Sequence, residues 1–263
     1  MFLSSCWAVA LRHTRLIRRD PNYIIMILFW PLLDVLPWGF LGTWLQQSQA
    51  ASLHNYHAAA LLGVLLWQVV GRGGSTIFAT FNEELWTHNL VNLFSLPLRI
   101  GAWMCGVTLF FMLMMAATSA CSLLVIYCLY DVSIWYLVTT GLVFLLPLLL
   151  SSIWLGFMCL QVVLKLGKRG AELGWAIMWV MMPFSGAFYP LDVLPHWGQV
   201  LSSWLPMSYV FQAMRGQVMY GKDPTALLVK GYLLGALYAA VAIVGFVYAF
   251  NRSKRKGLAR LAD

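Results

Sequence analysis

Six long apolar runs dominate this chain and restrict what it can fold into. Only 10% of its 263 residues are charged, whereas a soluble domain usually carries about 25%. A helix satisfies its own backbone hydrogen bonds in lipid, and about 20 apolar residues suffice to cross a bilayer. A membrane β-barrel would instead show alternating segments of about ten residues, which are absent. We therefore predict an all-α integral membrane protein whose six transmembrane helices cover residues 22–45, 58–81, 100–127, 134–164, 173–188 and 226–250.

The basic residues are distributed unevenly among the segments that join these runs. With six spans and an inside N-terminus, most of the 17 Lys and Arg residues fall on the inner side. Cytoplasmic segments of membrane proteins carry such an excess of positive charge. Both termini are therefore predicted to lie in the cytoplasm. Anionic lipid headgroups account for the net charge of +8, so no nucleic-acid partner is needed to explain it.

The two ends of the chain are predicted to lie outside the 21–250 membrane domain. Residues 1–20 form an amphipathic helix at the inner membrane surface, and residues 251–263 form a basic cytoplasmic tail. At about 100° per residue, one face of the N-terminal helix collects four arginines, which are Arg12, Arg15, Arg18 and Arg19. Pro21 separates this helix from the first span, because the residue before a proline avoids the helical region. The alternative is an ordinary basic flank of the first span.

Two charged residues, Asp34 and Arg72, fall inside the apolar runs. Asp34 lies about 13 residues from the inner end of the first run and Arg72 about 11 from that of the second, so their depths agree to roughly one turn. An unpaired charge at mid-membrane costs ~2.5–3.5 kcal/mol, which favours an ion pair between them. Two alternatives stay open: Arg72 faces a pathway for anionic substrates, or neither residue lies so deep. The surrounding sequence GRGGS indicates close helix packing or a local distortion.

The segment 82–98 joins the second and third runs on the inner side. Glu83 and Glu84 are predicted to open a short helix there, near its positive N-terminal end. One apolar face of this helix collects Trp86, Leu90, Leu93 and Phe94. Such a face needs a docking partner or the lipid surface. The alternative is a plain interfacial loop helix.

The segment 186–223 breaks the apolar pattern on the outer side. It starts with GAFYPLDVLP, and we expect Gly186 and Pro190 to end the fifth span before it crosses a full bilayer. The apolar residues that follow are too few for another crossing and suit a dip back into the outer leaflet. Irregular backbone at that depth must be covered by protein or line a cavity. We therefore predict an outer re-entrant gate built from Gly186, Tyr189, Pro190, Asp192 and Pro195.

The order of these elements resembles the membrane subunit of an ABC exporter of the type-2 class. The resemblance covers nearly the whole chain, and its most specific part is the pattern FSGAFYPLDVLP…LPMSYVFQAMR from Phe184 to Arg215. Members of this class export polysaccharides, lipo-oligosaccharides or drugs. The resemblance therefore implies an ATP-driven exporter subunit for an amphipathic substrate in a bacterial inner membrane.

The resemblance also implies the partners of this chain. A separate ABC ATPase, in two copies per complex, would bind ATP and Mg²⁺, because no nucleotide-binding loop occurs here. This chain would bind no cofactor itself. A second permease chain would complete a homodimer or heterodimer among the membrane lipids. The inner helix 84–94 would be the coupling helix that docks on the ATPase.

Two other functions compete with this hypothesis. An ion-coupled transporter or channel could use Asp34 and Arg72 as its site, but it predicts broken helices in both halves of the chain, and one strong break is found. A membrane enzyme acting on lipid-linked substrates would need clustered catalytic groups at one face. The sequence contains no such cluster and no metal-ligand motif, so we predict no catalytic residue, no metal site and no enzymatic activity for this chain.

Overall fold

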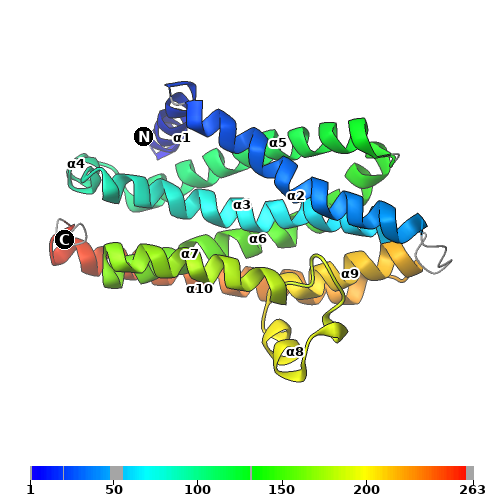
Figure 1. Cartoon of the computed structure of the whole chain (residues 1–263). Helices are drawn as coiled ribbons and strands as arrows, with labels where there is room; N and C mark the ends of the chain where they lie inside the picture. Colours follow the sequence, from blue (N-terminus) through cyan, green and yellow to red (C-terminus); the bar gives the residue numbers. More distant parts are fainter. Residues whose placement is uncertain (1, 20, 48–55, 131, 259–263) are drawn as a thin grey trace.

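A computed structural model describes residues 2–19, 21–47, 56–130 and 132–258 as a bundle of helices (Figure 1). No strand occurs in these described ranges. The first half contains α1 (Phe2–Arg19), α2 (Pro21–Gln47), α3 (Tyr56–Trp86), α4 (Leu90–Ser95) and α5 (Ile100–Leu129). The second half contains α6 (Ile134–Leu166), α7 (Lys168–Phe184), the 3₁₀ turn η2 (Leu191–Val193), α8 (His196–Ser203), α9 (Pro206–Tyr220) and α10 (Thr225–Arg255).

Four helices in the described part of the chain are long and apolar enough to cross a membrane: α3, α5, α6 and α10. The other two predicted spans fall on α2, which has 27 residues, and α7, which has 17. The predicted fifth span was misplaced. α7 begins five residues earlier, at Lys168, and ends at Phe184, so residues 185–188 leave the helix. Gly186 adopts a φ of 73° there, a conformation that ends a right-handed helix.

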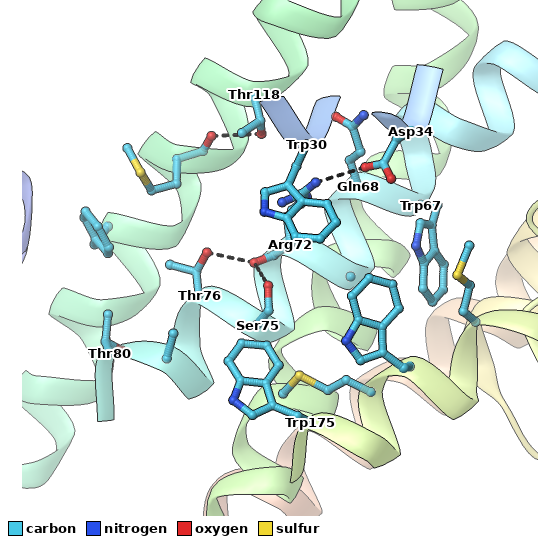
Figure 2. Close-up of a pocket in the computed structure, with 17 residues that line it drawn as sticks. Trp30, Asp34, Trp67, Gln68, Arg72, Ser75, Thr76, Thr80, Thr118 and Trp175 are labelled. Atoms are coloured by element: carbon cyan, nitrogen blue, oxygen red, sulfur yellow. Dashed lines mark hydrogen bonds and ion pairs between the residues drawn. The ribbon is translucent and has the colours of Figure 1, made fainter. Parts of the chain in front are cut away.

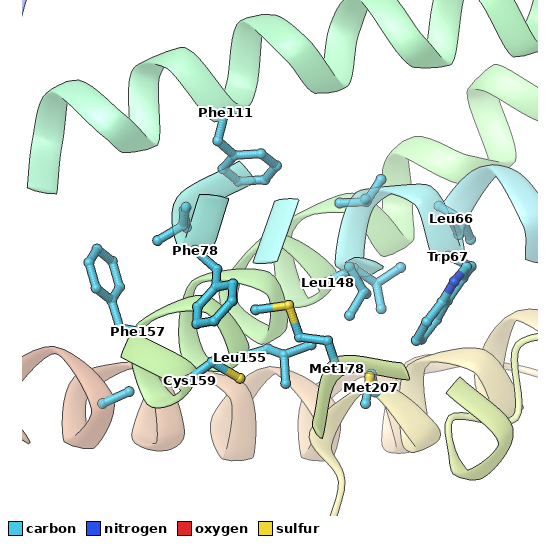
Figure 3. Close-up of a cluster of buried hydrophobic side chains, with 14 of the residues drawn as sticks. Leu66, Trp67, Phe78, Phe111, Leu148, Leu155, Phe157, Cys159, Met178 and Met207 are labelled. Carbon is cyan, nitrogen blue, oxygen red and sulfur yellow. The ribbon is translucent and has the colours of Figure 1, made fainter. Parts of the chain in front are cut away.

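α3 lies at the centre of the bundle, where it packs against α2, α5, α6, α7 and α9. The glycines of the GRGGS sequence bring α3 close to α6, as predicted: a side chain at Gly73 would collide with Ser152 and Phe111. From the facing helix, a Cβ at Gly156 would lie 2.9 Å from Cβ of Ile77. These small residues allow the close backbone approach typical of membrane helices. Large side chains fill the remaining space between α3, α5, α6 and α7 (Figure 3).

α1 is a separate helix that packs along α5. It buries Cys6, Val9 and Ala10, whereas Trp7 and Leu3 on the same helix are exposed. The next helix begins at Pro21, in agreement with the predicted break; Asp20 itself lies outside the described residues. α1 is therefore held on the bundle by one apolar face and presents a second apolar strip outward.

One end of the molecule gathers segments that are far apart in sequence. α1, α4 and the C-terminal end of α10 lie together there (Figure 1). Nζ of Lys254, on the last turn of α10, donates to the carbonyl oxygen of Phe94 at 3.4 Å. Nζ of Lys168, at the start of α7, lies 5.4 Å from the ring centroid of Trp86. This end carries most of the basic residues, including those of the α6–α7 turn and the α10 terminus; we call it the basic end.

The chain between α7 and α9 leaves the bundle and returns to it well inside the opposite end. The carbonyl of Ala187 lies against Gly63, about 10 Å along α3 from its first residue. Where the chain returns, the carbonyl of Pro206 lies against Gly231, a similar distance along α10. Between these points η2 and α8 project from the side of the bundle (Figure 1). Residues 185–188 are buried by protein. Irregular backbone at membrane depth must be covered in this way.

Candidate functional site: an aromatic cavity between α2, α3, α5 and α7

A cavity of about 450 Å³ lies between α2, α3, α5 and α7. Four tryptophans line it, and the hydroxyl groups of Ser75, Thr76, Thr80 and Thr118 lie among them (Figure 2). Methionines from α5 and α7 complete the wall. The tryptophans come from three helices and are Trp30, Trp67, Trp175 and Trp179. A pocket of this size, mostly apolar with a few convergent polar groups, is typical of ligand sites.

Asp34 and Arg72 meet in the wall of this cavity. Nη2 of Arg72 donates to Oδ2 of Asp34 at 3.1 Å, and both side chains stay about a quarter exposed. The guanidinium carbon of Arg72 also lies 5.3 Å from the ring centroid of Trp30, within the range of a cation–π contact. Asp34 and Arg72 therefore form an ion pair in the wall of a cavity. That Arg72 faces a pathway for anionic substrates stays a prediction.

Gln68, one turn before Arg72 on α3, is a polar residue of the cavity that the sequence analysis missed. Its Oε1 accepts a hydrogen bond from Oγ of Ser122 on α5 at 2.9 Å. Its Nε2 is buried and has no hydrogen-bond partner among the described residues. The spacing of four residues from Arg72 places both side chains on one helix face. That spacing, inside an apolar run, was a signal that could have identified Gln68.

The outer segment contacts the wall of this cavity through Phe188. The ring of Phe188 stacks on Trp38 of α2, with centroids 4.5 Å apart. Its other contact is edge-on to Trp67, a cavity residue, at 6.1 Å. Phe188 is 4% exposed. The sequence analysis passed over this residue because its neighbours Tyr189 and Pro190 carry the stronger turn signals.

Arg215 of α9 holds the outer segment in place. Nη2 of this arginine donates to the carbonyl oxygens of Gly186 at 2.8 Å and Ala187 at 3.3 Å. The side chain is buried, with 6% of the residue exposed. Two charge-assisted hydrogen bonds to irregular backbone anchor the segment more firmly than its apolar contacts alone. The sequence analysis named Arg215 only as the last residue of the family pattern.

The five residues predicted for the outer gate differ in burial and in contacts. Gly186 is buried beneath Arg215, as described above. Tyr189 donates its hydroxyl to the carbonyl oxygen of Pro183 at 2.9 Å. Pro190 and Pro195 flank η2 and precede α8, and Asp192 is exposed on η2. The turn residues therefore shape the projecting loop, while Phe188 contacts the cavity wall.

The predicted inner helix differs from the observed one. Glu83, Glu84 and Trp86 were expected at its start, but they form the last turn of α3, which runs on to Trp86. The helix ends where His88 adopts a φ of 55°, and α4 begins at Leu90. An apolar run that continues with helical periodicity does not reveal such a break, because the break depends on one backbone conformation.

The predicted docking face of this segment is also divided. Leu90, Leu93 and Phe94 are buried within the chain, so they do not offer a free apolar face. Trp86 stays 52% exposed. The outward surface of α4 and its exit is formed by other residues, which are Val91, Asn92, Ser95 and Leu96.

Glu84 ties this segment to α1. Its Oε1 lies 2.6 Å from Nη2 of Arg12, and its Oε2 accepts from Nδ2 of Asn89 at 2.6 Å. The Glu84 side chain is 3% exposed. Beside it, His13 of α1 is buried against Phe110, and burial lowers the pKa of His13 to about 4. Glu84 is therefore an internal link between α1, α3 and α4.

The comparison with protein families agrees with this architecture. A family model described as ABC-2 type transporter matches residues 4–219, which include α1, α4, the cavity and most of the 186–223 segment but not α10. No curated protein matches the chain.

Proposed function

The chain belongs to the ABC-2 type transporter family, and from this premise we propose that it is the membrane subunit of an ATP-driven exporter for an amphipathic substrate. Subunits of this family generally work with an ABC ATPase. Family membership favours this function over an ion-coupled transporter, a channel or a membrane enzyme. The substrate is a lipid-linked glycan, a lipo-oligosaccharide or a hydrophobic drug.

The observation that carries the proposal is the linkage of α4 to the rest of the bundle. α4 is joined to α3 and α1 by the Glu84 contacts and to α10 by Lys254. A displacement of α4 would therefore be transmitted to α3. Gln68 and Arg72 of α3 lie in the cavity wall. Rigid helices linked by packed contacts can shift between two arrangements as units. The 82–98 segment is thus suited to transmit a movement of the ATPase to the cavity.

In this proposal the ATPase docks on the outward surface of α4. ATP and Mg²⁺ bind to two ATPase copies, whose closure favours one of two packings of the membrane subunits. The basic end then lies in the cytoplasm of a bacterial cell, with both termini on that side, as the positive-inside rule expects. Residues 1–20 lie at the inner membrane surface as an interface helix, and residues 251–263 form a cytoplasmic tail.

A second copy of this chain, or a related permease, completes the export path. Exposed apolar side chains on α2 and α7 flank the cavity, and they include Phe29, Leu33, Trp179 and Val180. A partner subunit seated there would cover this surface and enclose the cavity opening. α7 and α9, with 17 and 15 residues, together supply the fifth of six crossings within residues 21–250. The 186–223 segment forms the outer gate.

The test is co-purification with a candidate ATPase, followed by ATP hydrolysis measured on the assembled complex. Val91→Asp and Leu96→Asp place charges on the outward surface of α4, and we expect both to lower assembly or substrate-stimulated hydrolysis at least tenfold. Val193→Asp is the matched control, because Val193 is 67% exposed on η2, away from the basic end. Normal assembly and hydrolysis in both α4 variants would refute the docking proposal.

A further inference from the structure

A second hollow in the bundle lies between α3, α5 and α6, and its volume is about 170 Å³. α5 and α6 both pack along α3 but make little contact with each other, so a groove stays open between them. We call this hollow the α5–α6 groove. The aromatic cavity faces another side of α3, which carries Trp67, Gln68 and Gly71. The α3 residues that line the groove recur every three to four positions and so share one helix face. They are Leu62, Leu65, Leu66 and Val69.

The wall of this groove is almost free of polar groups. Ser119 of α5 carries the one hydroxyl among the described residues that line it, and none of these residues is ionisable. A hollow lined in this way stays dry and gives a charged ligand no partner. If each group fills about as much volume as a water molecule in the liquid, about 30 Å³, the groove holds on the order of six methylene groups. A single hydrocarbon chain therefore matches both its chemistry and its size.

The groove lies at the depth of lipid acyl chains. α5 and α6 are both long and apolar enough to cross a membrane. Along α6 the groove runs from Leu137 to Leu145, about 5 to 17 Å from the first residue of that helix. α6 starts at the end of the bundle opposite the basic end, and half of a hydrocarbon core is about 15 Å thick. The groove is therefore level with the acyl chains of the leaflet opposite the basic end.

A bilayer lipid fits this place better than a protein partner does. The second permease is placed against α2 and α7, on the side of the aromatic cavity, so it leaves the groove uncovered. A stable protein interface buries about 800 Å² on each partner, whereas a groove of about 170 Å³ accepts little more than one chain. Ala116 and Leu142 at the rim are exposed on the outside of the bundle, so a chain can enter from the side.

The charge near the groove restricts the headgroup of such a lipid. Residues 100–164, which comprise α5, the turn after it and nearly all of α6, contain no Lys, Arg or His. An anionic headgroup would therefore find no basic side chain on these helices. Exposed rings do occur at this end, on Tyr127 of α5 and on Trp135 and Tyr136 of α6. Aromatic faces attract cations, which favours a headgroup with an ammonium group and no net charge.

We propose that the α5–α6 groove holds one acyl chain of a phosphoethanolamine lipid from the leaflet opposite the basic end. The chain fills the space between α5 and α6 against the apolar face of α3, and the headgroup lies beside Trp135 and Tyr136. This lipid is a resident partner of the bundle, bound apart from the aromatic cavity. Only the exclusion of the second permease from the groove rests on the proposed function.

Photolabelling of the full chain in phosphatidylcholine nanodiscs tests this proposal. The probe is a phosphoethanolamine lipid with a diazirine at the middle of one acyl chain, and labelled residues are located by peptide mass spectrometry. We expect Leu123 and Leu145, which line the groove and are partly buried, to be labelled at least threefold more than Leu124 and Leu146. The latter two are 61% and 56% exposed outside the groove, so passing lipids reach them more easily. A phosphoglycerol lipid with the same tail should label the groove at least threefold less.

A variant that fills the groove provides the second readout. Ala116→Phe places a ring in the groove and should lower the labelling of Leu123 at least fivefold. Ala117→Phe is the matched control, because Ala117 is exposed on the same turn of α5 but does not line the groove. Equal thermal unfolding of the two variants shows that the loss is one of lipid binding. Ser119→Leu is a smaller filling change and should lower the labelling in the same direction.

Labelling that follows exposure, with Leu124 and Leu146 ahead of the groove residues, would overturn the proposal in favour of unspecific lipid contact. Labelling of the groove by the phosphoglycerol lipid at the same level or above would overturn the headgroup assignment. Disulfide cross-links between copies of an Ala116→Cys variant, absent from the parent protein, would overturn it in favour of a second copy of the chain. None of these results alters the ATPase assembly assay, so failure of this proposal is distinguishable from failure of the exporter function.

Discussion

Arg12→Ala should destabilise the protein at the contact between α1 and α3. It removes the cation that lies 2.6 Å from Glu84. The Glu84 side chain is 3% exposed, whereas that of Arg12 is 39% exposed. Breaking a buried pair from one side costs about 3–5 kcal/mol, because the remaining charge is left uncompensated. Water can reach the Arg12 position in part, so we expect about 2–3 kcal/mol.

The opposite change should cost less. Glu84→Gln removes the buried charge and keeps an oxygen that accepts from Asn89, so the expected loss is about 1 kcal/mol. The double variant Arg12→Ala/Glu84→Gln should then be more stable than Arg12→Ala alone, since no buried carboxylate is left unpaired. A double-mutant cycle isolates this coupling.

Thermal unfolding in nanodiscs, followed by tryptophan fluorescence at a fixed heating rate, measures these effects. For a chain of this size about 2–4 °C corresponds to 1 kcal/mol, so Arg12→Ala should unfold about 4–12 °C lower than the parent protein. Arg15→Ala is the control, because Arg15 is exposed on the same helix. Equal unfolding temperatures for the Arg12 and Arg15 variants, or a double variant less stable than Arg12→Ala, would refute the reasoning.

Four further predictions use other parts of the structure. Asp34→Asn and Arg72→Gln should each lower folded yield, and the double variant should recover part of the loss; additive losses would show that the pair does not interact. The pKa of about 4 for buried His13 lies below its ordinary value of 6.5. The unfolded chain therefore binds a proton that the folded chain rejects, and stability falls by up to ~2–3 kcal/mol as pH drops from about 6.5 to 4; His13→Phe should flatten the unfolding temperature over this range. Arg215→Met should speed amide hydrogen exchange in residues 185–190, and exchange as slow as in the parent protein would contradict its anchoring role. Gly186→Ala should cost about 1 kcal/mol in thermal unfolding, because a φ of 73° disfavours side chains; an unchanged unfolding temperature would argue against this conformation.

Several features of the fold could be predicted because lipid restricts the backbone. Scarce charge and long apolar runs require helices. The regular rise of a helix converts sequence distance into depth, and this conversion singled out Asp34 and Arg72, which the structure brings together at 3.1 Å. The glycines beside Arg72 also predicted close helix packing. A residue without a side chain lets another helix approach its backbone, and this property can be read from the sequence.

The inner and outer segments were harder to predict because their roles depend on neighbours. Helical periodicity placed Leu90 and Phe94 on one apolar face, but it does not say whether the chain itself or a partner covers that face; here the chain covers it. From the sequence, Glu84 was expected to be an exposed acidic residue. In the structure it is buried, because Arg12 of α1 pairs with it. Phe188 packs against Trp38 and against the cavity residue Trp67, and both are distant from it in sequence.

The sequence by itself determined that this chain is helical and membrane-embedded, and where its charges must find partners, because burial in lipid penalises every unsatisfied polar group. The tertiary structure alone decided that Gln68, the ion pair and four tryptophans from three helices surround one cavity. It also decided that Arg215 holds Gly186. Such convergence depends on how helices cross and which side chains meet, and no local pattern along one helix records those distances.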